Sequence, residues 1–192
     1  MLFRSFNPPS RFDAHPRPSD ASAYTFAQSR SVTRPSIDAF VDAVREYVGL
    51  VDSDHPVELF AVRRLLLLLQ FHITAVETGP HAADADGTRP DDDSYRRAVG
   101  RLGGLGFDFY RVVFDPHDLD ATDEPIFGHL SDDLADIYRD LADGLSMADA
   151  GHVEDACREW SFSYQSHWAR HASHALVAIE LYRTEHLLRT DS

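Results

Sequence analysis

Three histidines lie close together near the C-terminal end of the chain, in the segment REWSFSYQSHWARHASHAL (residues 158–176). His167, His171 and His174 follow one another at spacings of four and three residues, which places them on one side of an α-helix. Imidazole nitrogen binds divalent metals and also acts as a general acid or base near neutral pH. The spacing therefore suggests metal binding or proton transfer, beside a structural role as hydrogen-bonded polar residues between helices.

Aspartates in a second segment, HLSDDLADIYRDLADGLSMADAG (residues 129–151), are possible partners for these histidines. The segment has the clearest helical pattern of the chain, with Ser131 as the expected N-cap. Its aspartates lie on a flank beside the leucine face, so antiparallel packing would bring them to the imidazoles at the border of the core. The expected polar seam comprises Asp133, Asp136, Tyr138, Asp140, Trp160, His167, Trp168, His171 and His174.

Geometry limits the metal hypothesis. His167 and His174 are seven residues apart, roughly 10 Å along a helix axis, so one ion cannot take both. A neighbouring pair remains, either His167 with His171 or His171 with His174. The other ligands would come from His72, Glu77, Asp133 and Asp136. We take His167, His171 and His72 as the candidate ligands of a divalent ion such as zinc, manganese or iron.

Less specific interpretations account for the same residues. Aspartate is seldom buried, so the aspartates are expected mainly on a solvated flank. The histidines are then structural, and Trp160, Tyr164 and Trp168 belong to the core. Cys157, the only cysteine, is expected to pack as a small apolar residue. The sequence contains neither a phosphate-binding glycine loop nor a Gly-x-Ser-x-Gly nucleophile motif.

Composition restricts the partners and the compartment. The formal net charge of −14 over 192 residues argues against sequence-independent binding to nucleic acid and against binding to anionic membranes. A single cysteine permits no intramolecular disulfide, and the N-terminus lacks the apolar segment of a signal peptide. The run LFAVRRLLLLLQFHITAV contains two arginines and is interpreted as a buried helix. We therefore expect a soluble, cytoplasmic protein.

Periodicity predicts an all-α fold. Residues 1–33 hold four of the ten prolines and no lasting apolar period, which indicates a flexible arm. Residues 34–190 are expected to form a single domain, a bundle of about five to six helices. The last helix should be long, from about Val153 to Leu188. The segment FDFYRVVFDP is ambiguous, and we expect a short helix there because a lone strand would have no partner.

Three segments together carry a family resemblance: LGFDFYRVVFDP, SDDLADIYRDLADGL and EWSFSYQSHWARHASHAL. In this order they resemble a bacterial family of small helical proteins, domain of unknown function 5063, over residues 36 to 185. The resemblance implies an all-α fold and no particular activity. It highlights the matching positions Asp133, Asp136, Tyr138, Asp140, Trp160, His167, Trp168 and His171. Gln165 replaces an acidic residue of the family pattern and Ala169 a glycine, and the loss of that carboxylate argues against a carboxylate-rich metal site.

The histidine spacing is also similar to that of metal-binding four-helix bundles of the DinB type. Those take one histidine from an early helix and a His-x-x-x-His pair from a late one, roles that His72, His167 and His171 would fill. Our first interpretation is nevertheless a binding or interaction module in which the polar seam is structural. Its partner would be a second copy of the chain or another protein. The alternative is a metal-dependent hydrolase or transferase that uses His167 and His171 together with carboxylates. The sequence leaves open whether the protein is an enzyme.

Overall fold

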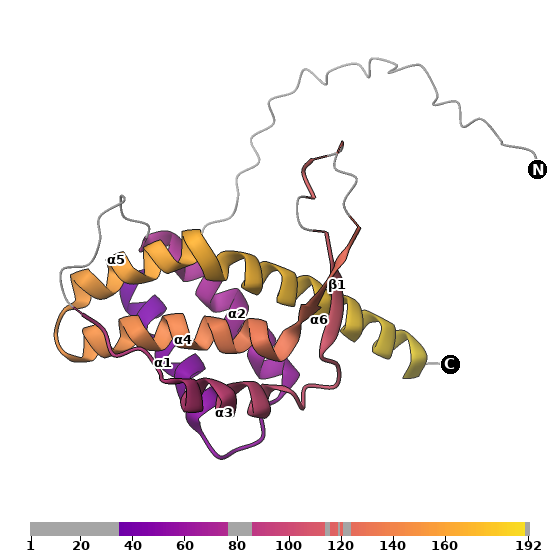
Figure 1. The fold of residues 1–192 in the computed structure, drawn as a ribbon, viewed down its shortest axis with the longest axis horizontal. Coiled ribbons are helices and arrows are strands. Elements are labelled where there is room, and N and C mark those ends of the chain that lie inside the picture. The colour runs from indigo at the N-terminus through magenta and orange to yellow at the C-terminus, as the bar shows by residue number, and fades with distance from the viewer. Residues whose placement is uncertain (1–34, 77–85, 114–115, 119, 121–123, 191–192) are drawn as a thin grey trace, which may run out of the picture. The chain divides into compact units, whose positions relative to one another are not determined.

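The computed structural model describes residues 35–76, 86–113, 116–118, 120 and 124–190. The expected arm, residues 1–33, and Glu77 therefore lie outside the described residues. The elements, in chain order, are α1 (Ile37–Asp52), α2 (Leu59–His72), the 3-10 turn η1 (Ile73–Ala75), α3 (Asp92–Leu102), β1 (Phe109–Val112), β2 (Ile126–His129), α4 (Leu130–Asp149), α5 (Val153–Ser163), the π-helical η2 (Tyr164–Trp168) and α6 (Ala169–Thr190) (Figure 1).

The predicted helical bundle with a long C-terminal helix is confirmed. Two helices, α1 and α3, begin at a side-chain cap: Ser36 Oγ accepts from the backbone N–H of Ala39 at 3.2 Å, and Asp91 Oδ1 accepts from that of Ser94 at 2.8 Å. Among the described residues, no helix combines the length and the apolarity needed to cross a bilayer.

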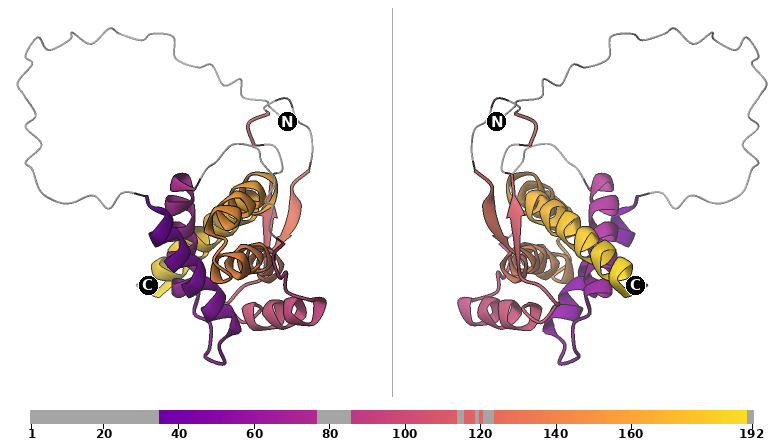
Figure 2. Two further views of the ribbon diagram at one scale, coloured as in Figure 1. Left: turned by 90° about the vertical axis from the view of Figure 1, so that its left-hand side faces the viewer. Right: turned by 90° about the vertical axis from the view of Figure 1, so that its right-hand side faces the viewer.

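Helix α4 is the central element of the bundle. It contacts α1, α3, α5 and α6, and Figure 2 shows it enclosed by these helices. Its leucine face is fully buried, with Leu134, Ile137 and Leu141 at 0% exposure. The hydroxyl of Tyr47 donates to the carbonyl of Leu134 at 2.9 Å, which ties α1 to α4 inside the core. Because α4 is held on all these sides, the side chains on its remaining flank have fixed positions.

The long C-terminal helix is continuous but contains one wide turn. Helices α5 and α6 are joined by η2, in which the N–H of Ala169 bonds the carbonyl of Tyr164, five residues back. On the α5 side, Trp160 is fully buried against α4 at Gly144. A Cβ atom at Gly144 would lie only 2.3 Å from the indole nitrogen of Trp160, so glycine is required for this close approach.

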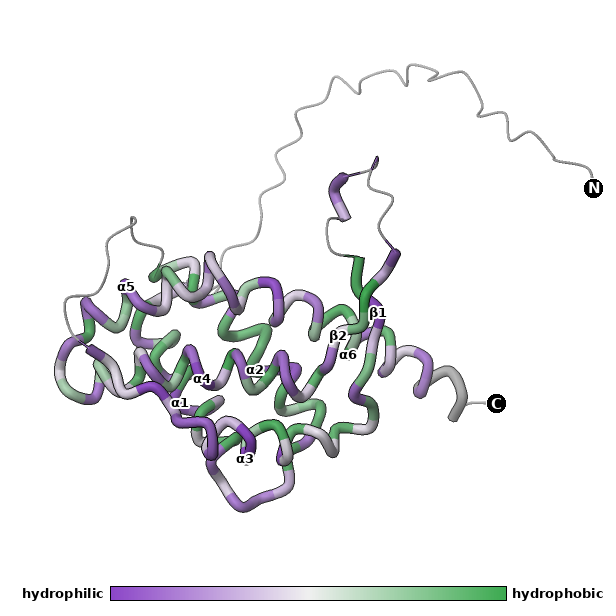
Figure 3. Tube along the Cα trace, viewed as in Figure 1, coloured by the Kyte–Doolittle hydropathy of each residue, from purple (hydrophilic) through white to green (hydrophobic). Residues whose placement is uncertain are grey.

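The prediction of a short helix in FDFYRVVFDP is wrong. Residues Phe109–Val112 form β1, which pairs antiparallel with β2. The sequence argument failed because the partner strand, IFGH, is only four residues long and lacks an alternating pattern. In this register Tyr110 is opposite Gly128, where a Cβ atom would come within 2.5 Å of the tyrosine ring. Figure 3 shows apolar and polar residues mixed along the paired strands. Phe114 lies outside the described residues.

Candidate functional site

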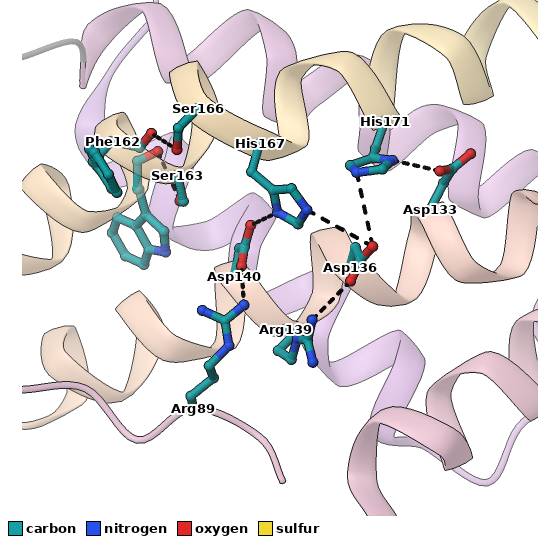
Figure 4. A network of polar contacts seen from close by, with 11 residues as sticks. Arg89, Asp133, Asp136, Arg139, Asp140, Phe162, Ser163, Ser166, His167 and His171 are labelled. Atoms are coloured by element: carbon teal, nitrogen blue, oxygen red, sulfur yellow. Dashed lines mark hydrogen bonds and ion pairs between the residues drawn. The ribbon is translucent and has the colours of Figure 1, made fainter. Parts of the chain in front are cut away.

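The site consists of three aspartates of α4 that face two histidines of the C-terminal helix (Figure 4). Asp133, Asp136 and Asp140 recur at three and four residues and so share one face of α4. His167 comes from the wide turn η2, and His171 follows in the first turn of α6. We call these five residues the Asp/His cluster. π-Helical turns are frequent at functional sites.

Each imidazole is hydrogen-bonded through Nδ1 to a carboxylate. His167 Nδ1 lies 2.6 Å from Asp140 Oδ2, and His171 Nδ1 lies 2.5 Å from Asp133 Oδ1. An ionised carboxylate only accepts hydrogen bonds, so each Nδ1 carries the proton and donates it. When the rings are neutral, each Nε2 therefore presents a lone pair.

Both Nε2 atoms face the same carboxylate oxygen. Asp136 Oδ2 lies 4.0 Å from His167 Nε2 and 3.9 Å from His171 Nε2. One ligand atom from each of the three residues lies within 4.8 Å of the other two, close enough for a single ion to draw them together. The two imidazole planes are inclined at 79° to each other, with ring centroids 4.8 Å apart. The two imidazoles are therefore not stacked, and both bring Nε2 near the same carboxylate oxygen.

Further side chains hold the aspartates in place. Arg89 donates to Asp140 Oδ1 at 2.9 Å, and Arg139 donates to Asp136 Oδ1 at 3.1 Å. The hydroxyl of Tyr110, from β1, donates to Asp133 Oδ2. For Asp136 this leaves Oδ2 directed to the imidazoles, while its other oxygen is satisfied. Asp140 is only 3% exposed, so its two partners compensate for the loss of water around a buried charge.

The electrostatics of the site follow from these contacts. The hydrogen bond to Asp133 raises the pKa of His171 above its usual value, against an opposing effect of burial. Burial, together with the hydrogen bond to Asp133, raises the pKa of Tyr110, so this phenol stays protonated. Burial lowers the pKa of His174, and the charge of Arg170 adds to this effect. The pKa values of these two neighbouring histidines thus move in opposite directions, upward for His171 and downward for His174.

A pocket of about 340 Å³ gives access to the cluster. Its floor includes His167, His171 and Asp133, and its opposite wall is the hairpin of β1 and β2. Asp136 does not line the pocket, so a molecule in it would meet the cluster from the side of the two imidazoles. The volume lies within the usual range of small-molecule sites.

Other residues of the expected polar seam lie elsewhere. The hydroxyl of Tyr138 donates to Asp52 of α1 at 2.7 Å, away from the histidines. Trp160 and Trp168 are both fully buried in the core. His174 lines the pocket but does not belong to the group of converging ligand atoms.

His72, expected as a third ligand, is not in that group either, as far as the described residues show. It is 5% exposed at the end of α2, beside the ring of Phe71 at a centroid distance of 4.9 Å. Asp136 supplies the third converging atom in its place. The expectation of a solvated aspartate flank is also corrected: Asp133 and Asp136 are 13% and 14% exposed, because the C-terminal helix covers them.

Three residues that support the cluster had little or no signal in the sequence. We did not single out Tyr110, because its segment was expected to be helical. Arg89 belongs to a polar stretch without periodicity, so nothing predicted its contact with Asp140. Arg139 follows Asp136 by three residues on one helix, and this spacing is a recognisable signal for an ion pair.

The comparisons with known proteins agree with this architecture. No functionally curated protein is similar enough to count as a match. The crystal structure of protein BF1032 from Bacteroides fragilis has a similar fold, with a TM-score of 0.56 and 17% identity over 74% of this chain and 89% of that one. The family model described as Domain of unknown function (DUF5063) matches residues 31–185. The chain therefore belongs to the family of domain of unknown function 5063, as its three quoted segments predicted.

Proposed function

We propose that the protein is a metal-dependent hydrolase that binds one divalent ion between Asp136 Oδ2, His167 Nε2 and His171 Nε2. One observation carries this proposal: both imidazoles bond a carboxylate through Nδ1 while both Nε2 atoms face a single carboxylate oxygen. Metal-binding histidines almost always donate their other ring N–H to a carboxylate, a carbonyl or water in this way, which fixes the tautomer that can bind metal.

The donor set favours zinc, with iron and manganese as alternatives. Two imidazoles and one carboxylate suit these ions, whereas calcium and magnesium prefer oxygen ligands alone. Three protein ligands are typical of catalytic zinc sites, which keep a coordination position for water or substrate, while structural sites use four. The adjoining 340 Å³ pocket supports the catalytic interpretation, because it provides room for that further ligand.

Charge also favours a cation at this position. The carboxylates of Asp133, Asp136 and Asp140 meet at this place, where Asp140 pairs with Arg89 and Asp136 with Arg139. With neutral imidazoles these five charged groups carry more negative than positive charge, and the three carboxylates are at most 14% exposed. A proton on His171 or a divalent ion would each offset the excess negative charge, so metal and proton compete for the same cluster.

The residues of the chain have distinct roles in this proposal. A bound ion would supply Lewis acidity and a water of lowered pKa. Asp133 and Asp140 hold the imidazoles in the orientation and tautomer that bind metal. Arg89 and Arg139 hold the carboxylates of Asp140 and Asp136 in place. Tyr110 fixes Asp133 from the hairpin and thereby connects the pocket wall to the ligands.

The test is a zinc titration of untagged protein after its metal has been removed. Wild type should bind close to one equivalent, and a His167→Ala/His171→Ala variant and an Asp136→Asn variant should each lose the site. His186→Ala is the matched control, because it removes an imidazole from the same helix outside the cluster. Absence of saturable binding, or binding that survives both site variants, would refute the proposal.

A structural and interaction role is the second candidate, and one observation favours it. Every aspartate of the cluster already has partners: Arg89 for Asp140, Arg139 for Asp136 and Tyr110 for Asp133, besides the imidazoles. On this view the network only fixes the hairpin and helices that a protein partner or a second copy would meet. Wild type would then bind no zinc, while the double histidine variant would unfold at a markedly lower temperature.

A further inference from the structure

A second, larger hollow lies between the hairpin and the end of the C-terminal helix. It has a volume of about 580 Å³ and is bounded by β1 on one side and by α6 on the other. Figure 1 shows β1 crossing α6 at this place. Its walls are mainly apolar and include Phe107, Phe109, Val112, Val177 and Leu181. We call it the apolar groove.

The apolar groove exposes side chains that proteins usually bury. Val177 and Leu181, one turn apart on α6, are each 61% exposed, and Phe109 on β1 is 67% exposed. These side chains line both sides of one hollow, so a chain-like or flat apolar group would contact them together. Covering such surface is favourable in proportion to the area removed from water.

The apolar groove adjoins the pocket over the Asp/His cluster. Tyr110, Val112 and His174 line both spaces, so the two hollows are direct neighbours. The polar end contains the imidazoles of His167 and His171, and the apolar end contains none of the cluster. A single ligand that reaches both spaces must therefore be polar at one end and apolar at the other.

We infer that the substrate is a small amphipathic molecule, with an acyl chain or aryl group in the apolar groove and its reacting polar head at the Asp/His cluster. This inference rests on the proposed metal site, because that site fixes which end reacts. Adjacency to the site selects the occupant: the groove shares three lining residues with the pocket over the imidazoles, and its volume is that of a small-molecule pocket. A folded partner would cover the hairpin from outside and would not need the neighbouring cluster.

A series of n-alkyl hydroxamates tests this with zinc-loaded protein, because the hydroxamate head chelates metal and the chain length is varied separately. Burial of a methylene is worth about 0.8 kcal/mol, or roughly fourfold in affinity when complete. The groove is partly open, so we expect about two- to threefold per methylene. Octanohydroxamate should then bind on the order of 100-fold more tightly than acetohydroxamate.

Variants locate the effect within the molecule. Val177→Ser and Leu181→Ser should each reduce the ratio of the octanohydroxamate to the acetohydroxamate affinity several-fold. Phe60→Ser is the control, since Phe60 is equally exposed at 61% but lines neither hollow, and it should keep the wild-type ratio. The two residues are exposed on α6, so these changes should not impair folding.

The outcomes separate this inference from the proposed function. Zinc-loaded protein that binds both hydroxamates equally would overturn the amphipathic substrate and leave the metal site standing. A steep chain-length dependence that Val177→Ser and Leu181→Ser do not change would overturn the placement in the apolar groove. Failure to bind zinc at all would overturn both.

Discussion

The two halves of α4 pack against the same C-terminal helical run by different chemistry. In the C-terminal half, Gly144 leaves room for Trp160, whose indole N–H donates to the carbonyl of Leu141 at 3.0 Å. The Trp160 ring also meets the edge of Phe40 at a centroid distance of 5.3 Å. From the N-terminal half to the midpoint of α4, Asp133, Asp136 and Asp140 face two imidazoles instead.

The two halves differ in what burial contributes to stability. Burying Trp160 removes a large apolar surface from water and satisfies its one polar atom, so this half stabilises the fold directly. Burying carboxylates costs solvation that their partners only offset, and apolar residues would commonly serve stability as well or better. Stability alone therefore does not explain the polar half, and the proposed metal site would account for it.

The largest expected effect is in the apolar half. Trp160→Ala should lower the free energy of unfolding by about 3–5 kcal/mol, because it removes a fully buried ring and leaves a cavity. Urea denaturation followed by circular dichroism measures this loss. Phe162→Ala on the same helix is the control: Phe162 is 65% exposed, and its loss should cost under about 0.5 kcal/mol. Equal losses would contradict the assignment of Trp160 to the stabilising half.

In the polar half, Asp140→Asn should act on zinc binding. An amide can either accept from or donate to His167 Nδ1, so it no longer fixes the tautomer of the ring, and loss of such a partner weakens metal affinity about 10–100-fold. Competition with a chromophoric chelator measures the affinity. Asp149→Asn, at the far end of α4, removes a carboxylate that bonds Arg45 and should leave the affinity unchanged. If the two variants behave alike, Asp140 does not position the ligand.

The N-terminus of α4 is expected to affect the stability of the protein at acidic pH. The expected cap Ser131 does not cap α4; the helix starts at Leu130, and Asp108 Oδ1 accepts from the Ser131 N–H at 2.9 Å. Burial alone would raise the pKa of Asp108, but the hydrogen bonds from Ser131 and His129 lower it overall.

A lowered pKa in the folded state gives stability that is present above the unfolded value, near 3.9, and is lost as pH falls through the folded value. Wild type should therefore lose stability more steeply than Asp108→Asn between pH 5 and pH 3. Urea midpoints across this range provide the measurement. Parallel curves would show that Asp108 contributes no pH-dependent stability.

The smallest effect is expected at Gln165. The family resemblance suggested that the missing carboxylate weakens a metal site, but Gln165 is exposed and bonds Ser161 Oγ at 3.2 Å. Gln165→Glu should therefore change zinc affinity by less than about twofold, since an exposed charge is screened by solvent and salt. A gain of tenfold or more in the same chelator assay would mean that the side chain reaches the cluster.

Periodicity was sufficient to predict the helices and, in part, the site. The leucine face of α4 and the spacing of His167 and His171 follow from the helical repeat, and that repeat also placed the aspartates beside the core. It could not show that the C-terminal helix covers Asp140, because burial of a flank depends on the crossing of two helices that are distant in sequence. Tyr110 required the strand pairing with Gly128, a non-local contact that no local pattern encodes.

The wide turn η2 makes the phase of the C-terminal helix depend on where a residue is lost. It contains one more residue per hydrogen-bonded loop than an ordinary helical turn. Deleting Ser166 would therefore remove the extra residue and return this turn to regular pitch, and α6 beyond it would keep its phase relative to Trp160. Deleting Phe162 from the regular turns of α5 would instead rotate everything beyond it by about 100° relative to Trp160 and turn His171 away from Asp133. Of these two deletions, only the one in the regular helix would separate the packing of Trp160 from the placement of the imidazole.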